Sequence, residues 1–432
     1  MLGPATLLRD GTLVPGTLVL SHPEQLDRLR LSCPEAVEAA LIAGDPSHDR
    51  ILAGLPWRDR YRDHLETGHR KLVMVSSTWG PGSLLGSRPE LLNRLLAELP
   101  VDEYRVALAL HPNTWHGHGH HQVRSWLAEA ERAGLRVLPP RQGWQAALVA
   151  ADHVIGDHGS VTAYGASLGT HTMLGAFPDT EMDPFSPIAR FGRSATRLRA
   201  DLPLLPQILA DAADHKPDRF AAFTDRLNSE PGGSGRILRE TFYRLLDLPE
   251  PEHPVRTLPA DVPIPYRRGW PDTTDHAPLW STVQEEGSRL RVRRHPAESV
   301  TKERLFLDRP HLVTHTDETQ ARWSEAACLL LCGPDSESPG EGASWALLRA
   351  RLSDHPRAHL AVAADGPDCL LVDRDGTRIR LVADDPGHRH DPTAAASAYW
   401  HLWVEGEAPE GSLLVLLGEH ESSFTVRASN EE

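Results

Sequence analysis

Short apolar runs alternate with helix-like segments between residues 71 and 176, and this alternation restricts the possible folds more than any other feature of the chain. The apolar runs are short and end at glycine, proline or polar residues, as strands do. Strands that alternate with helices at this spacing predict a doubly wound parallel sheet, and hence an α/β fold. The expected strands are Leu72–Ser76, Tyr104–Leu110, Leu135–Leu138, His153–Gly156 and Thr172–Ala176, and the expected helices are Pro89–Leu99, Gln122–Ala133, Gly143–Ala151 and Thr162–Leu168.

The rest of the chain divides around this region. Gly44-Asp45-Pro46 breaks the chain after an N-terminal segment with strand-like runs. Leu248–Pro265 is proline-rich and typical of a linker, and the runs beyond it predict a separate, smaller α/β domain. We therefore expect an N-terminal segment at 1–45, a Rossmann-like nucleotide-diphosphate-binding domain at 46–247, a linker at 248–285 and a C-terminal α/β domain of unknown role at 286–432.

Composition indicates a globular protein whose partners are not nucleic acids. Hydrophobic residues make up 40% of the 432 residues and charged residues 24%, and the formal charge of −15 argues against non-specific binding to nucleic acid or anionic membranes. The four cysteines have no Cys-x-x-Cys spacing, which favours a reducing compartment. No apolar run has the length of a transmembrane helix, and Arg9 and Asp10 interrupt any signal peptide, so we expect a cytoplasmic protein.

Three loops follow expected strands and carry groups that suit a phosphate ligand. They are Ser77-Thr78-Trp79-Gly80, His111-Pro112-Asn113 and the turn Gly156–Val161. In an open parallel sheet, ligands bind beyond the carboxyl ends of the strands. These loops are therefore expected to form one site.

The turn from Asp157 to Val161 carries the strongest physical argument. It leads into a helix, where unpaired N–H groups and the helix dipole favour an anion. Gly159 lets the backbone approach a ligand, the Ser160 hydroxyl can donate to a phosphate oxygen, and Asp157 can hold the turn in shape. The alternative is that Ser160 only caps the helix.

Two further residues of the expected site can each be interpreted either as functional or as purely structural. His111 can donate to a phosphate or protonate a leaving phosphate, or it can be a partly buried histidine bonded to a carbonyl. Asn113 can orient the loop or the ligand, or only form an Asx-turn.

We expect no bound metal and no cofactor. No Asp-x-Asp sequence follows a strand of the nucleotide-binding region. The histidines of His116–His121 invite a zinc interpretation, but no cysteine or acidic residue lies among them, so a solvated loop that enters a helix is favoured. Asp373-Arg374-Asp375-Gly376 lacks the full calcium-loop pattern and predicts a hairpin turn.

In their order, the three loops resemble the C-terminal half of the CDP-glycerol glycerophosphotransferase family, which has a GT-B fold of two facing Rossmann-like domains. Ser77-Thr78-Trp79-Gly80 is similar to the family's threonine-containing loop, and His111-Pro112 matches its His-Pro. Asp157-His158-Gly159-Ser160 is similar to its Asp-Tyr-Ser-Ser turn, and the segment from Gly44 to Arg50 looks like its hinge. The resemblance ends near Asp179.

The resemblance implies a transferase of cell-envelope polymer synthesis with a nucleoside-diphosphate-linked small-molecule donor. Such an enzyme moves a phospho-alcohol or glycosyl group to a hydroxyl acceptor. His111 would act on the leaving phosphate as the catalytic residue. The residues expected to bind the donor or shape its site are Thr78, Asn113, Asp157, Gly159, Ser160, Val161 and Asp179.

The sequence also departs from the family's pattern. Gly159 replaces a serine, and no acidic residue lies within Thr162–Ser167, where related proteins hold the ribose, so Asp179 is the expected substitute. Only about 44 residues precede the hinge. The resemblance therefore implies that 1–45 is the remnant of an N-terminal GT-B half, with the acceptor side supplied by a missing half or a partner chain.

Two other functions are compatible with this region. One is a UDP-N-acetylglucosamine 2-epimerase-like enzyme, although Gly159–Ala163 lacks the paired glutamates that follow the Ser-Gly-Gly turn of such enzymes. The other is a non-catalytic nucleotide-binding protein without an acceptor half.

Overall fold

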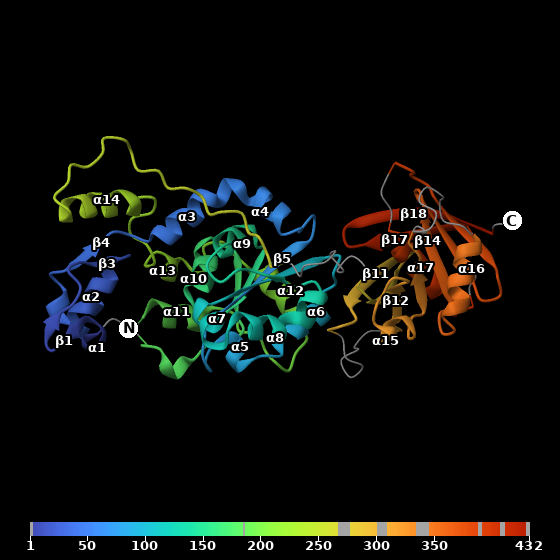
Figure 1. Cartoon of the computed structure of the whole chain (residues 1–432), viewed down its shortest axis with the longest axis horizontal. Coiled ribbons are helices and arrows are strands. Elements are labelled where there is room, and N and C mark those ends of the chain that lie inside the picture. Colours follow the sequence, from blue (N-terminus) through green and yellow to red (C-terminus); the bar gives the residue numbers. More distant parts are fainter. Residues whose placement is uncertain are drawn as a thin grey trace.

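The computed structural model describes residues 3–184, 186–266, 277–299, 309–333, 345–387, 391–406 and 411–428. An N-terminal segment, a central parallel-sheet domain and a C-terminal barrel follow one another along the longest axis of the molecule (Figure 1). Within the described ranges, no helix has both the length and the apolar character needed to cross a membrane.

The central domain contains the parallel sheet that the sequence predicts. Its strands are β5 (Lys71–Ser77), β6 (Tyr104–Leu110), β7 (Arg136–Val137), β8 (His153–Gly156) and β9 (His171–Leu174), in the order β7-β6-β5-β8-β9. Every neighbouring pair is parallel. The α/β fold with a parallel sheet is therefore confirmed.

Helices cover both faces of this sheet, so its strands are almost continuously apolar. Alternate residues of β5 face opposite layers: Val73 and Val75 belong to one hydrophobic cluster, whereas Leu72 and Met74 belong to another. The first layer contains α6 (Leu91–Glu98) and α8 (His120–Arg132), and the second contains α3 (Pro46–Gly54), α4 (Arg58–His64) and α9 (Trp144–Ala150).

The remaining helices of this domain surround the sheet. One of them is the short helix α13 (Ala221–Thr224). The others are α5 (Leu84–Ser87), α7 (Pro112–His118), α10 (Ser160–Ser167), η3 (Asp179–Glu181), α11 (Pro187–Ser194), α12 (Leu204–Asp214) and α14 (Ser234–Leu245).

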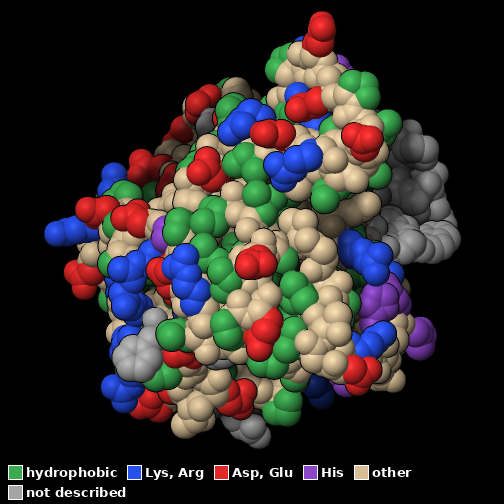
Figure 2. Space-filling view, turned by 90° about the vertical axis from the view of Figure 1, so that its left-hand side faces the viewer, with side chains coloured by type: hydrophobic (Ala, Val, Ile, Leu, Met, Phe, Trp, Pro, Cys, Tyr) green, Lys and Arg blue, Asp and Glu red, His purple; other side chains and the backbone are tan. Residues whose placement is uncertain are grey.

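The N-terminal segment forms a small separate layer. Strands β3 (Leu18–Leu20) and β4 (Ala40–Ile42) pair in parallel, with α2 (Pro23–Ser32) between them in sequence. It also holds α1 (Pro4–Leu7), β1 (Leu8–Arg9), β2 (Thr12–Leu13) and η1 (Pro34–Ala36), and η2 (Leu55–Trp57) lies between α3 and α4. Figure 2 shows acidic and basic side chains interspersed on the face at this end of the molecule.

The segment from Gly44 to Asp49 joins this layer to the sheet domain through buried polar contacts. The Asp45 carboxylate caps α3 by accepting from the Ser47 and His48 N–H groups. The buried Asp49 carboxylate accepts from the N–H groups of Gly232 (2.7 Å) and Ser234 (3.1 Å) at the start of α14. The start of α3 is therefore held by hydrogen bonds within the segment and to the residues that begin α14.

The proline-rich stretch is not a free linker where the structure describes it. The Ala260 carbonyl accepts from the Tyr61 hydroxyl at 2.7 Å, and Ala260 itself is buried in the sheet domain's core. Further along, the Tyr266 N–H donates to the Val137 carbonyl. Proline removes N–H donors but leaves the carbonyls and rings free to pack. The segment therefore lies along the sheet domain, as Figure 1 shows.

The C-terminal region differs from the predicted smaller α/β domain. Its described residues form a closed barrel of nine strands in the order β10-β11-β17-β18-β16-β15-β14-β13-β12. The strands are β10 (Leu279–Glu286), β11 (Arg289–Pro296), β12 (His311–His315), β13 (Leu329–Leu331), β14 (Leu360–Asp365), β15 (Asp368–Asp373), β16 (Arg378–Ala383), β17 (Gly411–Leu417) and β18 (His420–Ala428). The β10 strand begins inside the expected linker.

Helix α17 (Pro392–Val404) forms the centre of this barrel's core. Its residues from Thr393 to Tyr399 are all buried, and they pack with side chains of strands around the barrel. A helix that is apolar on every side must be enclosed, and the alanines keep it thin. The shorter α15 (Ala321–Ser324) and α16 (Trp345–Asp354) complete the region, and the predicted hairpin at Asp373–Gly376 joins β15 to β16.

Three histidine rings lie close together near the amino ends of β8 and β9, and we expect them to make the sheet domain less stable in acid. The rings of His153 and His171 lie 5.1 Å apart, and those of His171 and His215 lie 4.2 Å apart. Burial, reinforced by the charge of His171, lowers the pKa of His153 to about 4. In the unfolded chain this histidine has an ordinary pKa of ~6.5. Between the folded and the unfolded pKa values, the unfolded chain therefore binds more protons than the folded chain.

Stability should accordingly be complete above pH ~6.5 and decline as the pH falls toward 4. We expect His153 to contribute on the order of 2 kcal/mol to this decline. Urea unfolding of the wild type and His153→Gln at pH 7.5 and 5 measures it, and the variant should show the shallower pH dependence. Equal pH dependence in the two proteins would contradict this assignment.

Candidate functional site

The carboxyl ends of β5 and β8 are tied together by Asp157, which is fully buried. One carboxylate oxygen accepts from the Thr78 N–H, the Thr78 hydroxyl and the Leu84 N–H, each at 2.8 Å. The other oxygen accepts from the Gly159 N–H at 3.0 Å. Asp157 thus connects the loop after β5 to its own turn.

The helix α10 begins at Ser160, so the predicted alternative role of Ser160 as a cap does not occur. The capping position belongs to Gly159, which has no side chain to offer. Ser160 is exposed at the first helical position, and Val161 beside it is half-buried. The first N–H groups of a helix have no intrahelical acceptor, so this end can receive an anion.

The space around Gly159 explains why a glycine stands there. A Cβ atom at this position would lie 2.7 Å from Thr78 Cγ2 and 3.1 Å from an Asp157 oxygen. The loop after β5 and the turn after β8 therefore approach each other more closely than a side chain would allow. The Thr78 hydroxyl donates its proton to Asp157, which makes Thr78 a positioning residue in this arrangement.

His111 lies after β6 and caps α7. Its Nδ1 atom accepts from the Asn113 N–H at 3.1 Å, so in the neutral ring the proton is on Nε2. The ring packs against exposed Trp79, with centroids 4.2 Å apart. Burial lowers the pKa of His111, and the Asp157 charge opposes this shift. The neutral imidazole can therefore offer an Nε2–H donor.

Asp179 lies apart from this network. Its carboxylate forms a bidentate ion pair with Arg197 at 2.6 and 2.7 Å, and both side chains are largely exposed. The His116–His121 segment is solvated, as expected, but it is helical rather than a loop: α7 and α8 meet at Gly119, which has φ +82°. In the described chain, the cluster with metal-ligand spacing is instead Glu285, His401 and Glu405 on the barrel.

Sequence reasoning missed the aromatic and polar contacts that hold α10. The Tyr164 ring stacks between His48 and Trp144, at 5.9 Å from each, and its hydroxyl donates to Asp45 at 2.5 Å. Asp45 lies almost 120 residues away in sequence, and no local pattern couples it to Tyr164. The segment before α3 therefore fixes the helix that carries Ser160.

Comparison with known proteins finds similarity to solved structures over part of the chain, and to no protein-family model or curated sequence. No protein-family model matches the chain, and no curated protein sequence matches it. The wall teichoic acid polymerase TagF is similar over 53% of this chain and 58% of its own, with 15% identity and a TM-score of 0.37. The UDP-GlcNAc 2-epimerase from Neisseria meningitidis is similar over 53% and 61%, with 12% identity and a TM-score of 0.30.

A third similar structure is Anabaena HepE in complex with UDP and glucose. It covers 54% of this chain and 64% of its own, with 12% identity and a TM-score of 0.28. The chain thus spans about three fifths of the length of the solved structures it matches.

Proposed function

We propose that the chain is a GT-B-type transferase that binds a nucleoside-diphosphate-linked donor, with an activity like that of the CDP-glycerol glycerophosphotransferases. The observation that carries the proposal is the start of α10, where Gly159 leaves the helix end uncapped beside exposed Ser160. Two of the three loops that resemble that family, the one after β5 and the turn before α10, are joined here by Asp157, and His111 of the third packs against Trp79.

In the proposed reaction, an acceptor hydroxyl attacks the β-phosphorus of a CDP-alcohol. The bond between that phosphorus and the bridging oxygen breaks, CMP leaves, and the acceptor's proton passes to solvent or to a base. The N–H groups of α10 and the Ser160 hydroxyl hold the diphosphate, and the His111 Nε2–H donates to the leaving phosphate. Catalysis of this kind consists mostly of positioning and charge stabilisation.

Donor binding provides the first test. His111→Phe keeps a ring against Trp79 but removes the Nε2–H donor, and Ser160→Ala removes one hydroxyl. Each should weaken CDP-glycerol binding by about tenfold, as for the loss of a hydrogen bond to a charged group. Calorimetry gives the affinities, and CMP release is measured in parallel.

The matched control is His121→Phe, an exposed histidine at the start of α8, which should leave the affinity unchanged. The absence of heat with CDP- and UDP-linked donors would overturn the proposal. Binding with equal affinity by all three variants would place the ligand elsewhere. Binding without CMP release would leave a nucleotide-binding protein that lacks transferase activity.

A further inference from the structure

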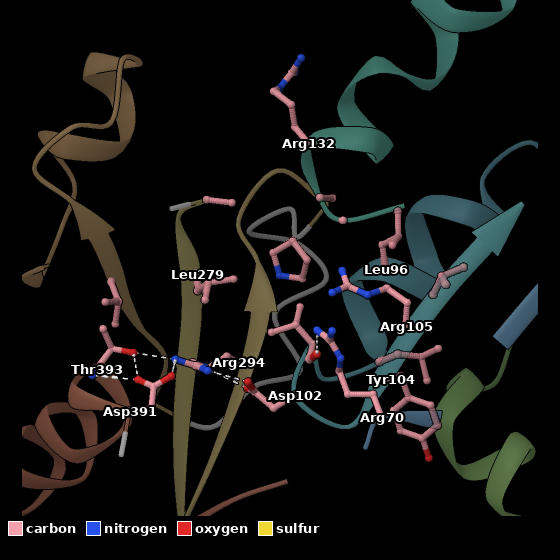
Figure 3. Close-up of a pocket in the computed structure, with 18 of the residues that line it drawn as sticks. Arg70, Leu96, Asp102, Tyr104, Arg105, Arg132, Leu279, Arg294, Asp391 and Thr393 are labelled. Carbon is pink, nitrogen blue, oxygen red and sulfur yellow. Dashed lines mark hydrogen bonds and ion pairs between the residues drawn. The ribbon is translucent and has the colours of Figure 1, made fainter. Parts of the chain in front are cut away.

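Trp79 is an exposed tryptophan beside the candidate donor site, and the proposed function gives it no role of its own. It follows β5 at the carboxyl edge of the sheet, whereas the barrel lies at the amino edge, where Arg294 binds Asp102 just before β6 (Figure 3). With 53% of its surface exposed, this large apolar ring gains free energy when another flat group covers it.

One face of the Trp79 indole is already covered. Its ring lies against the His111 ring, with centroids 4.2 Å apart and planes inclined by 35°. The loop that carries Trp79 is held in place, because the preceding residue, Thr78, donates its N–H and its hydroxyl to the buried Asp157 carboxylate. The part of the ring turned away from His111 is therefore left to solvent, on a backbone that hydrogen bonds fix.

The start of α10 lies close to the same loop. A Cβ atom at Gly159 would lie 2.7 Å from the Thr78 methyl carbon, and Ser160, the next residue, begins the helix. In the proposed function this helix end holds the diphosphate of the donor. Only a ribose separates the base of a nucleoside diphosphate from its phosphates. An aromatic ring directly after Thr78 is therefore placed to meet that base.

We propose that Trp79 binds the base of the donor by stacking on it, with His111 supporting the indole from the other side. This inference rests on the proposed function and names the part of the donor that the site selects. An aromatic side chain stacks on any base, because every base has a π-face. Trp79 therefore favours diphosphates that carry a nucleoside over those that do not, and it does not distinguish cytosine from uracil.

Calorimetry with CDP and the full chain tests the stacking. Trp79→Leu removes the flat face and should weaken CDP binding by about tenfold, as for the loss of one base–aromatic stack. Trp79→Phe keeps an aromatic face and should bind CDP nearly as tightly as the wild type does. The matched control is Trp126→Leu, because Trp126 is 57% exposed and also contacts a histidine ring, that of His118, but lies on α8. Its CDP affinity should be that of the wild type.

Two further measurements separate stacking from a purely structural role of Trp79. Pyrophosphate has no base, so Trp79→Leu and the wild type should bind it with equal affinity. CDP should quench the tryptophan fluorescence of the wild type and of Trp126→Leu by covering the Trp79 indole. The fluorescence of Trp79→Phe should not change in the same way, although this variant still binds CDP.

Failure of this inference differs from failure of the proposed function. CDP binding that His111→Phe and Ser160→Ala weaken but Trp79→Leu does not would overturn the stacking alone. Equal losses of CDP and pyrophosphate affinity in Trp79→Leu would also overturn it, because Trp79 would then only support His111. If Trp79→Leu does not fold, quenching of Trp79→Phe to the same extent as the wild type overturns it. The absence of CDP binding to the wild type would overturn both proposals.

Discussion

Replacing Arg294 with methionine will lower the free energy of unfolding by about 3–5 kcal/mol, the usual cost of removing one partner from a buried ion pair. Arg294 lies on β11 and is almost fully buried. Its guanidinium binds Asp102 of the sheet domain, Asp391 at the start of α17, and the Thr393 hydroxyl at 2.6 Å. Methionine fills much of the space but leaves both carboxylates without their cation.

The matched control lies on the same strand. Arg291 pairs with Glu286 at the surface, so Arg291→Met should change stability little. Urea unfolding measures all the variants. Arg294→Met combined with Asp391→Asn should recover part of the loss, because asparagine still caps α17 without a buried charge. A loss as small as that of Arg291→Met would mean that the buried ion pair contributes nothing to stability.

The pH dependence of the free energy of unfolding is a second test of the ion pair between Arg294 and Asp391. Burial alone would raise the pKa of the Asp391 carboxyl, but the charge of Arg294 and the hydrogen bonds at α17 hold that pKa below its ordinary value. The contribution is therefore present above pH ~4 and is lost as the pH falls through the folded pKa. In Arg294→Met the cation is absent. The difference in free energy of unfolding between this variant and the wild type should therefore shrink as the pH falls toward 4.

The parallel sheet could be predicted from sequence because its strands are local, apolar and separated by amphipathic helices. The run from Tyr104 to Leu110 matches β6 at both ends. The barrel could not be predicted in the same way. Its strand β12 is His311–His315, whose histidines and threonine are not typical of a core strand, yet every residue of it is buried. The polar side chains are accommodated by tertiary contacts, such as His311 with Ser397 at 2.9 Å.

The sequence predicts which residues form the candidate site, but it does not predict the hydrogen-bond network that the structure shows there. Strand ends and a helix start predict that Thr78, His111 and Ser160 lie near one another. The sequence does not reveal that Thr78 donates its hydroxyl to Asp157, or that Gly159 is required by Thr78 Cγ2. Those facts depend on how closely two loops approach, about 80 residues apart along the chain. Docking of the proline-rich segment was missed for a similar reason, because its anchor Ala260 meets Tyr61 only in the fold.

Asp157→Ala is expected to cost about 3–4 kcal/mol of stability and to abolish the proposed binding of a nucleoside-diphosphate-linked donor. The substitution removes an acceptor that serves the N–H groups of Thr78, Leu84 and Gly159 as well as the Thr78 hydroxyl. The N–H groups of Leu84 and Gly159 are buried, so each of them loses a partner that solvent cannot replace. The loop after β5 would then separate from the turn before α10, and Ser160 would lose its position.

Asp157→Asn and Asp179→Ala make this prediction specific. An asparagine keeps one oxygen for the loop after β5 but turns an amide donor toward the Gly159 N–H, so its cost should be smaller, about 1–2 kcal/mol. Asp179 forms an exposed pair with Arg197, and its removal should change stability little. Urea unfolding and CDP-glycerol calorimetry rank the variants together. If Asp157→Ala unfolds and binds as Asp179→Ala does, the network does not hold the site, because a buried carboxylate with four donors must cost more to remove than an exposed ion pair.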